Sequence, residues 1–243
     1  MDPILTVLSY SAAAAGAAGL GAVPAAIRRH LPSTWIGWAN ALAAGLMLGA
    51  AYTLMVPGLD REALPGAAGA ALGIGFVFLT HAALRTEDLE LNRLEHPAPE
   101  YGYQVLLVNT LHSAAEGIAI GVAMVLSLKF GGFMAVAIAV HNIPEGAVLS
   151  AILTSRGARL GEATMLAIAA KTSQVLLAVA TFAVVPAAPA LLPWALGFAV
   201  GALLYLVMAE LLPESYREAG HTTIALVTVA AMGIVVLLGG GPR

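Results

Sequence analysis

The sequence contains no cysteine and little charge: only 10% of its 243 residues are Asp, Glu, Lys or Arg, and 6% are aromatic. Without cysteine the chain has no disulfides, no thiolate metal sites and no cysteine nucleophile. Soluble domains carry roughly 25% charged residues. The low charge, with 60% hydrophobic residues and a mean hydropathy of +0.88, therefore indicates an integral membrane protein. No basic block is present that would suit nucleic acid, and a net charge of −3 says little about other partners.

Long apolar runs between charged residues or Pro/Gly clusters predict an all-α membrane protein with eight transmembrane helices. A helix needs about 20 apolar residues to cross the hydrocarbon of a bilayer. The predicted helices are residues 4–27, 35–56, 64–84, 103–128, 131–154, 163–185, 191–212 and 222–240, in one transmembrane domain covering 1–243. The first run follows Met-Asp-Pro without positive residues, so we expect a retained helix and not a cleaved signal peptide. The polar stretch 85–102 is expected to be a loop.

The distribution of arginine predicts the orientation in the membrane. The odd-numbered loops contain Arg28, Arg29, Arg85, Arg93, Arg156, Arg159 and Arg217, whereas the other side has Arg61, Lys129 and Arg243. Positive residues are enriched in cytoplasmic loops. The odd loops are therefore expected in the cytoplasm and both termini outside. The protein is expected in the plasma membrane, which is the inner membrane of a cell that has two. Only Lys171 is left over, and it falls within the sixth predicted helix.

Two similar hexapeptides lie inside the fourth and fifth predicted helices: His112-Ser-Ala-Ala-Glu116-Gly and His141-Asn-Ile-Pro-Glu145-Gly. A separation of four residues puts each histidine and glutamate on one helix face. A single histidine in the membrane could simply hydrogen-bond a neighbouring carbonyl. Two His–Glu pairs on consecutive helices favour function, because ionisable groups in hydrocarbon are costly unless paired, hydrated or bound to an ion. They predict a cation site.

The residue types around these pairs indicate which cation would bind. The same helix faces carry amide and hydroxyl groups, namely Asn109 and Ser113 on the fourth helix and Asn142 on the fifth. Pro144 leaves a backbone carbonyl one turn earlier without its helical hydrogen bond, which adds an oxygen donor. Imidazole with carboxylate suits Zn²⁺, Fe²⁺, Mn²⁺ or Co²⁺, whereas Ca²⁺ and Mg²⁺ favour oxygen ligands alone.

Other candidate residues have competing structural explanations. Met47, near the middle of the second predicted helix, offers a thioether that would favour Zn²⁺ or Cd²⁺, but it fits equally as a core-filling residue. His81, near the end of the third, is either an exit-route ligand or an interfacial residue. The remaining ionisable residues are assigned to the interface (Glu210 and Glu214), to loops (His30 and His221) or to no role (His96).

At these residues the chain resembles the ZIP (Zrt/Irt-like) family of divalent metal transporters, in its prokaryotic branch. His141-Asn142-Ile143-Pro144-Glu145-Gly146 matches the His-Asn-x-Pro-Glu-Gly motif of that family in full. The stretch Ala43-Ala44-Gly45-Leu46-Met47-Leu48 is similar to the family's second helix, where a methionine helps to bind metal. The resemblance implies a 3+2+3 arrangement, in which helices one to three and six to eight form an inverted repeat around the central pair. It also implies alternating access by an elevator-like or rocking motion.

The sequence departs from the family pattern around a second metal ion. The fourth helix lacks the Asn and Pro of the motif and has Ser113 where relatives have Asn. Asn142 stands where some relatives have Asp, and Gln174 where a glutamate helps to bind the second ion. Lys171 lies on the same face as Gln174, three residues earlier. We therefore expect a mononuclear site, with the Lys171 ammonium neutralising a glutamate beside a lost second site. The alternative is that Lys171 snorkels or faces a neighbouring helix.

The resemblance implies a carrier or slow channel that moves Zn²⁺, or else Cd²⁺, Fe²⁺ or Mn²⁺, toward the cytoplasm. His112, Glu116 and Glu145 are the expected direct ligands, assisted by His141 and Asn142. An intramembrane metallohydrolase is one alternative, although its His-Glu-x-x-His motif is absent from the sequence. A metal sensor or inactive paralogue is another. Small-residue helix faces are compatible with a homodimer.

Overall fold

The computed structural model describes residues 2–27, 32–59, 62–84 and 99–239, and all regular structure in these ranges is helical. Eight of its helical stretches are long and apolar enough to cross a membrane: Pro3–Pro24, Ser33–Gly58, Ala63–Leu84, Gln104–Leu126, Leu128–Ser155, Leu160–Ala187, Leu191–Glu218 and His221–Gly239. The predicted all-α fold with eight transmembrane helices is confirmed. The 3+2+3 arrangement and its inverted repeat remain predictions.

Several of the eight spans consist of more than one helical segment. In chain order the elements are α1 (Pro3–Ala17), the 3₁₀ segment η1 (Ala18–Gly21), α2 (Ala22–Ile27), α3 (Ser33–Leu59), α4 (Ala63–Leu84), α5 (Pro99–Leu126), α6 (Leu128–Ser155), α7 (Leu160–Ala170), α8 (Thr172–Ala187), α9 (Leu191–Leu206), the π segment η2 (Val207–Leu211), α10 (Leu212–Glu218) and α11 (His221–Gly239).

Helix α5 begins earlier than the sequence predicted. It starts at Pro99, so residues 99–102 are helical and do not belong to the expected loop 85–102, whose residues 85–98 lie outside the described ranges. Proline suits the first helical position because its missing N–H would have no intrahelical partner there. At its other end α5 is joined to α6 through Ser127 alone, whose hydroxyl accepts a hydrogen bond from the amide of Phe130 and so caps α6.

Three of the spans are interrupted by a change of helix type or direction. The first passes through η1 between α1 and α2, and the sixth breaks at Lys171 between α7 and α8. The seventh contains the five-residue π segment η2. In this segment the amide of Leu212 donates to the carbonyl of Val207, five residues earlier and not four. The next residue, Pro213, has no N–H and cannot donate a helical hydrogen bond. Such π segments inside α-helices are frequent at functional sites.

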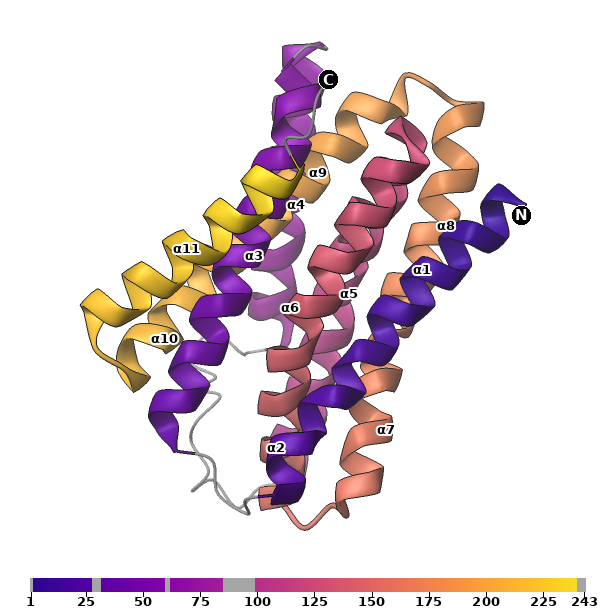
Figure 1. Cartoon of the computed structure of the whole chain (residues 1–243). Helices are drawn as coiled ribbons and strands as arrows, with labels where there is room; N and C mark the ends of the chain where they lie inside the picture. Colours follow the sequence, from indigo (N-terminus) through magenta and orange to yellow (C-terminus); the bar gives the residue numbers. More distant parts are fainter. Residues whose placement is uncertain (1, 28–31, 60–61, 85–98, 240–243) are drawn as a thin grey trace.

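The spans pack into two bundles (Figure 1). In the first, here called the α5–α6 bundle, α5 packs along α8 and α6, and α6 packs along α1, η1 and α7. In the second, the α3–α9 bundle, α4 packs along α9, and α3 packs along α11, α9 and α10. The bundles meet mainly where α3 lies against α6 and α5 lies against α9.

Glycine allows the closest helix approach in the α3–α9 bundle, between α4 and α9. A Cβ at Gly201 would lie 2.2 Å from the carbonyl oxygen of Ala70, and one at Gly73 would lie 2.2 Å from that of Phe198. Membrane helices rely on such close packing because lipid provides little hydrophobic drive for association. These faces are occupied within the chain, so a homodimer would have to use others. The homodimer remains a prediction.

We predict that Gly201→Ala destabilises the protein, whereas Gly75→Ala does not. The new methyl group at residue 201 would overlap the backbone of α4, and overpacking of this kind costs about 1–3 kcal/mol. A Cβ at Gly75, on α4, has no atom within 4 Å. Thermal unfolding of the detergent-solubilised variants measures the difference. Equal melting temperatures would contradict the close α4–α9 packing.

Candidate metal centre

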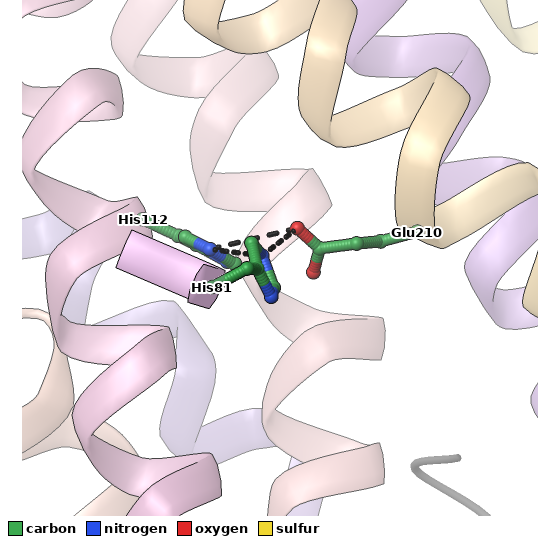
Figure 2. A group of neighbouring side chains, drawn as sticks. All are labelled: His81, His112 and Glu210. Atoms are coloured by element: carbon green, nitrogen blue, oxygen red, sulfur yellow. Dashed lines mark hydrogen bonds and ion pairs between the residues drawn. The ribbon is translucent and has the colours of Figure 1, made fainter. Parts of the chain in front are cut away.

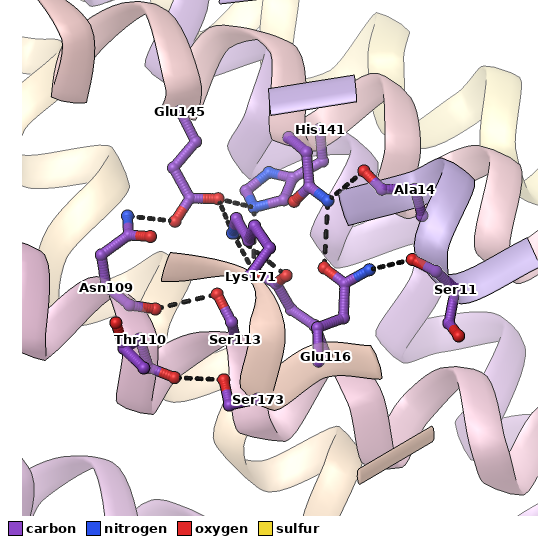
Figure 3. Close-up of polar contacts among 12 residues, drawn as sticks. Ser11, Ala14, Asn109, Thr110, Ser113, Glu116, His141, Glu145, Lys171 and Ser173 are labelled. Atoms are coloured by element: carbon purple, nitrogen blue, oxygen red, sulfur yellow. Dashed lines mark hydrogen bonds and ion pairs between the residues drawn. The ribbon is translucent and has the colours of Figure 1, made fainter. Parts of the chain in front are cut away.

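Helices α5 and α6 bring two glutamates and a histidine together near the middle of the membrane spans. The ligand atoms of Glu116, His141 and Glu145, called the central group below, all lie within 4.8 Å of one another. His141 Nε2 is 3.4 Å from Glu116 Oε1 and 3.2 Å from Glu145 Oε2. Glu116 and His141 are 1% and 3% exposed, so water solvates them little. Figure 3 shows their side chains converging from the two helices.

Lys171 provides the cation for this group of acids. Its Nζ lies 3.2 and 3.3 Å from the two carboxylate oxygens of Glu116 and also contacts Glu145 Oε2. The side chain is only 1% exposed. The alternative in which Lys171 snorkels to an interface is therefore wrong in this structure. The two carboxylates repel each other where water screens them little, and an ammonium in contact with both offsets that repulsion.

A break in the sixth span accompanies the position of Lys171. Its backbone, with φ −87° and ψ 6°, interrupts the helix between α7 and α8. The amide of Lys171 bonds to the carbonyl of Ile168, and the hydroxyl of Thr172 donates to the carbonyl of Ala169. Ser173 then donates to the carbonyl of Thr110 on α5. These bonds anchor the broken segment beside the central group.

The amides expected around a second metal ion are held by hydrogen bonds. Asn142 Nδ2 donates to Gln174 Oε1 at 3.0 Å and to the carbonyl of Ala14 at 2.8 Å. Gln174 Nε2 donates to the carbonyl of Ser11 at 3.4 Å. The 3₁₀ segment η1 follows, where the amide of Ala18 donates to the carbonyl of Ala15 and not to that of Ala14. The carbonyl of Ala14 is thus available to Asn142. Ser113, the other residue of this region, donates to the carbonyl of Asn109.

A second cluster of possible ligands joins the two bundles. His81 on α4, His112 on α5 and Glu210 in η2, called the second group, have ligand atoms within 4.8 Å of one another. His112 Nε2 lies 3.1 Å from His81 Nε2 and 3.5 Å from Glu210 Oε1, and His81 Nε2 lies 2.6 Å from the same oxygen. Figure 2 shows both rings directed toward the carboxylate.

The structure places the predicted ligands in two different groups. Glu116 and Glu145 lie together, but the histidine between them is His141, while His112 is directed to the second group. Asn142 is engaged through its Nδ2, although its Oδ1 has no hydrogen-bond partner among the described residues.

Sequence reasoning missed Glu210, which it assigned to the interface. A signal was present, since this glutamate ends an apolar run and Pro213 follows three residues later. What the sequence did not reveal is the π segment that carries Glu210 beside His81 and His112.

One cavity of about 580 Å³ connects the two groups, and Met47 also lines it. The lining continues past Glu214 to Arg217, whose side chain is 58% exposed, so the cavity reaches the surface at the end of α10. Toward the opposite end, apolar side chains pack tightly beyond the central group. Leu54, Ile120, Met124 and Met134 are all buried there. The central group is therefore open toward one end of the bundle and covered at the other.

Nitrogen and carboxylate oxygen donors without thiolate suit Zn²⁺ and neighbouring transition-metal ions. The donor set fits such an ion as a substrate in either group. Each offers three donors, and a tetrahedral ion would take its fourth from water or a neighbouring side chain.

Comparison with known proteins identifies the family. The family described as ZIP Zinc transporter matches residues 80–239. The chain is 31% identical to the zinc transporter GufA of Myxococcus xanthus, over 86% of this chain and 88% of that protein. It is 30% identical to the zinc transporter ZIPB of Bordetella bronchiseptica, over 93% of this chain and 78% of that one. A provisionally named zinc transporter of Arabidopsis thaliana is 35% identical over 94% of this chain, which spans only 38% of its length.

The chain therefore belongs to the ZIP family and is a multi-pass membrane protein. Family members are transporters and not enzymes, so the metallohydrolase alternative is set aside.

We predict that Lys171→Met lowers the melting temperature of the metal-free protein. Removing one partner of a buried ion pair leaves an uncompensated charge and costs about 3–5 kcal/mol. Zn²⁺ should restore more stability to this variant than it adds to the wild type, because the ion replaces the missing cation. Thermal unfolding in chelator and in Zn²⁺ tests both effects, with the exposed Lys129→Met as the matched control. If Lys171→Met melted at the same temperature as the wild type in chelator, the ion pair would contribute nothing to stability.

Proposed function

Because the chain belongs to the ZIP family, we propose that it carries Zn²⁺ through the membrane by way of the central group. The observation that supports this is the cavity that joins two groups of metal-ligand side chains, Glu116–His141–Glu145 and His81–His112–Glu210. Ion pairs that only stabilise the fold would not require a second group of metal-ligand side chains on the same cavity. Cd²⁺, Fe²⁺ and Mn²⁺ have compatible ligand preferences and are the other candidate substrates.

We propose that transport is directed toward the cytoplasm. The cavity reaches the surface beside Arg217 at the end of α10, and Arg156 and Arg159 lie in the α6–α7 connection at the same end of the spans. The other arginines of the odd-numbered loops, Arg28, Arg29, Arg85 and Arg93, lie outside the described residues. The positive-inside rule assigns the arginine-rich end to the cytoplasm and the two termini to the outside.

In the proposed sequence of steps, the central group replaces the water around the ion and the second group receives it on the way out. Glu116 and Glu145 supply negative charge, and His141 supplies a nitrogen donor. Met47 lines the same cavity and could supply its thioether to the ion. His112 lies one helical turn from Glu116, so an ion moving along α5 passes from one group to the other. His81 and Glu210 complete the receiving group from the other bundle.

We further propose that the central group holds one ion and not a pair. A dinuclear site would use Glu116 and Glu145 as bridging ligands, but Lys171 contacts both of these carboxylates. Asn142 and Gln174, which stand where a second ion would need ligands, form hydrogen bonds to each other and to backbone carbonyls of α1.

Uptake of radioactive zinc into proteoliposomes tests the transport function. The wild type should take up Zn²⁺, and Glu145→Ala should reduce uptake to the level of protein-free vesicles, because it removes a ligand from the central group. Glu62→Ala, which removes an exposed carboxylate, should leave uptake unchanged. A wild type that takes up no more zinc than Glu145→Ala would instead support a metal sensor or an inactive paralogue.

The number of bound ions tests the mononuclear site. An anomalous-scattering map of zinc-soaked crystals should show a single ion among Glu116, His141 and Glu145. The double variant Lys171→Ala/Gln174→Glu should add a second ion about 4 Å away, a spacing typical of paired sites. The matched control is Gln174→Glu alone, which keeps the lysine and should keep one ion. A close pair of ions in the wild type would refute the proposal.

A further inference from the structure

Asn109 contacts the central group but was not predicted as a ligand. It lies on α5, one turn before His112 and two turns before Glu116. Its Nδ2 donates to Glu145 Oε1 at 2.5 Å (Figure 3). An ionised carboxylate can only accept hydrogen bonds, so the amide must present its nitrogen to Glu145. The amide oxygen is thereby fixed in the other direction.

That oxygen is a buried acceptor without a hydrogen bond. Asn109 Oδ1 has no partner among the residues that the structure describes. Buried amide oxygens are almost always paired, and leaving one unpaired is costly. Asn109 also lines the cavity that contains both groups of candidate ligands. An unpaired carbonyl oxygen in such a position is explained if it binds the substrate that passes through the cavity.

Asn109 lies close to a member of each group. Through Glu145 it is hydrogen-bonded to the central group, and it shares a helix face with His112 of the second group, three residues later. The amide is therefore a neighbour both of Glu145, which it contacts, and of His112, one helical turn away on the same face.

We propose that Asn109 is a metal ligand for the transfer between the two groups, its Oδ1 binding the ion after it leaves Glu145 and before it reaches His112. The proposal rests on the function proposed above. In this step one oxygen ligand replaces another on the ion, and no proton or electron is transferred. A neutral amide oxygen attracts a dication less than a carboxylate does, so it lets the ion pass on without holding it.

The alternative is that Asn109 only positions Glu145. Removing the side chain would then impair transport without any contact between residue 109 and the ion. A direct test of contact is available because the chain has no cysteine. In Asn109→Cys the only thiol would stand at this position, and a bound Cd²⁺ or Co²⁺ would produce a thiolate charge-transfer absorption. Thr110→Cys is the matched control, since Thr110 is the next residue on α5 and does not line the cavity.

The experiment combines this absorption with zinc uptake. Asn109→Cys should develop the charge-transfer band at one Cd²⁺ per chain and lose it when Glu145→Ala is added, whereas Thr110→Cys should show no band. Asn109→Leu, close in size to asparagine but without polar atoms, should lower the initial rate of Zn²⁺ uptake by about tenfold or more, the range seen when groups around a metal site are removed. If the Leu variant does not fold, Asn109→Ala replaces it.

Two results would overturn the proposal while wild-type uptake remains intact. One is a folded Asn109→Cys without a charge-transfer band, and the other is an Asn109→Leu or Asn109→Ala variant with the wild-type rate. Absence of zinc uptake by the wild type itself would instead refute the transport function. The two failures are therefore distinguishable.

Discussion

The contact of Lys171 with Glu116 and Glu145 is the interaction on which the rest of the site depends. The buried Glu116 and the partly buried Glu145 need a counter-charge in an apolar medium, and the chain provides one of its own. Zn²⁺ and Lys171 together would bring three positive charges to two negative ones, so the two cations compete for the same oxygens. If the central group binds Zn²⁺ as proposed, Lys171 is a cation of the chain itself that can displace the ion.

The backbone is irregular where this chemistry occurs. The sixth span breaks at Lys171, η1 follows the carbonyl of Ala14 that accepts from Asn142, and the π segment η2 carries Glu210. A regular α-helix satisfies its own backbone groups and gives each side chain a fixed direction. Local departures release carbonyls as acceptors and redirect side chains, at a cost in helix stability. Such conflicts with the regular pattern are expected at functional positions.

Much of the fold followed from the sequence because apolar runs of membrane-spanning length have few alternatives to a helix. The spacing of His and Glu likewise predicted which side chains share a face, and the charge of Lys171 predicted a partner beside the acids. Spacing on one helix cannot tell which neighbouring helix meets that face. For this reason His112 was assigned with Glu116 and Glu145, although it faces His81 and Glu210. Glu210 was missed because it lies within a π segment, which turns its side chains away from the directions of a regular α-helix.

The two groups differ in how they are attached to the bundles. Glu116, His141, Glu145 and Lys171 all belong to the α5–α6 bundle, so their mutual distances do not depend on the α3–α9 bundle. His112 belongs to the α5–α6 bundle, whereas His81 and Glu210 belong to the α3–α9 bundle. Any sliding of one bundle against the other would keep the central group intact and separate the second group. The division of the two groups between the bundles is compatible with the alternating access that the family resemblance predicts.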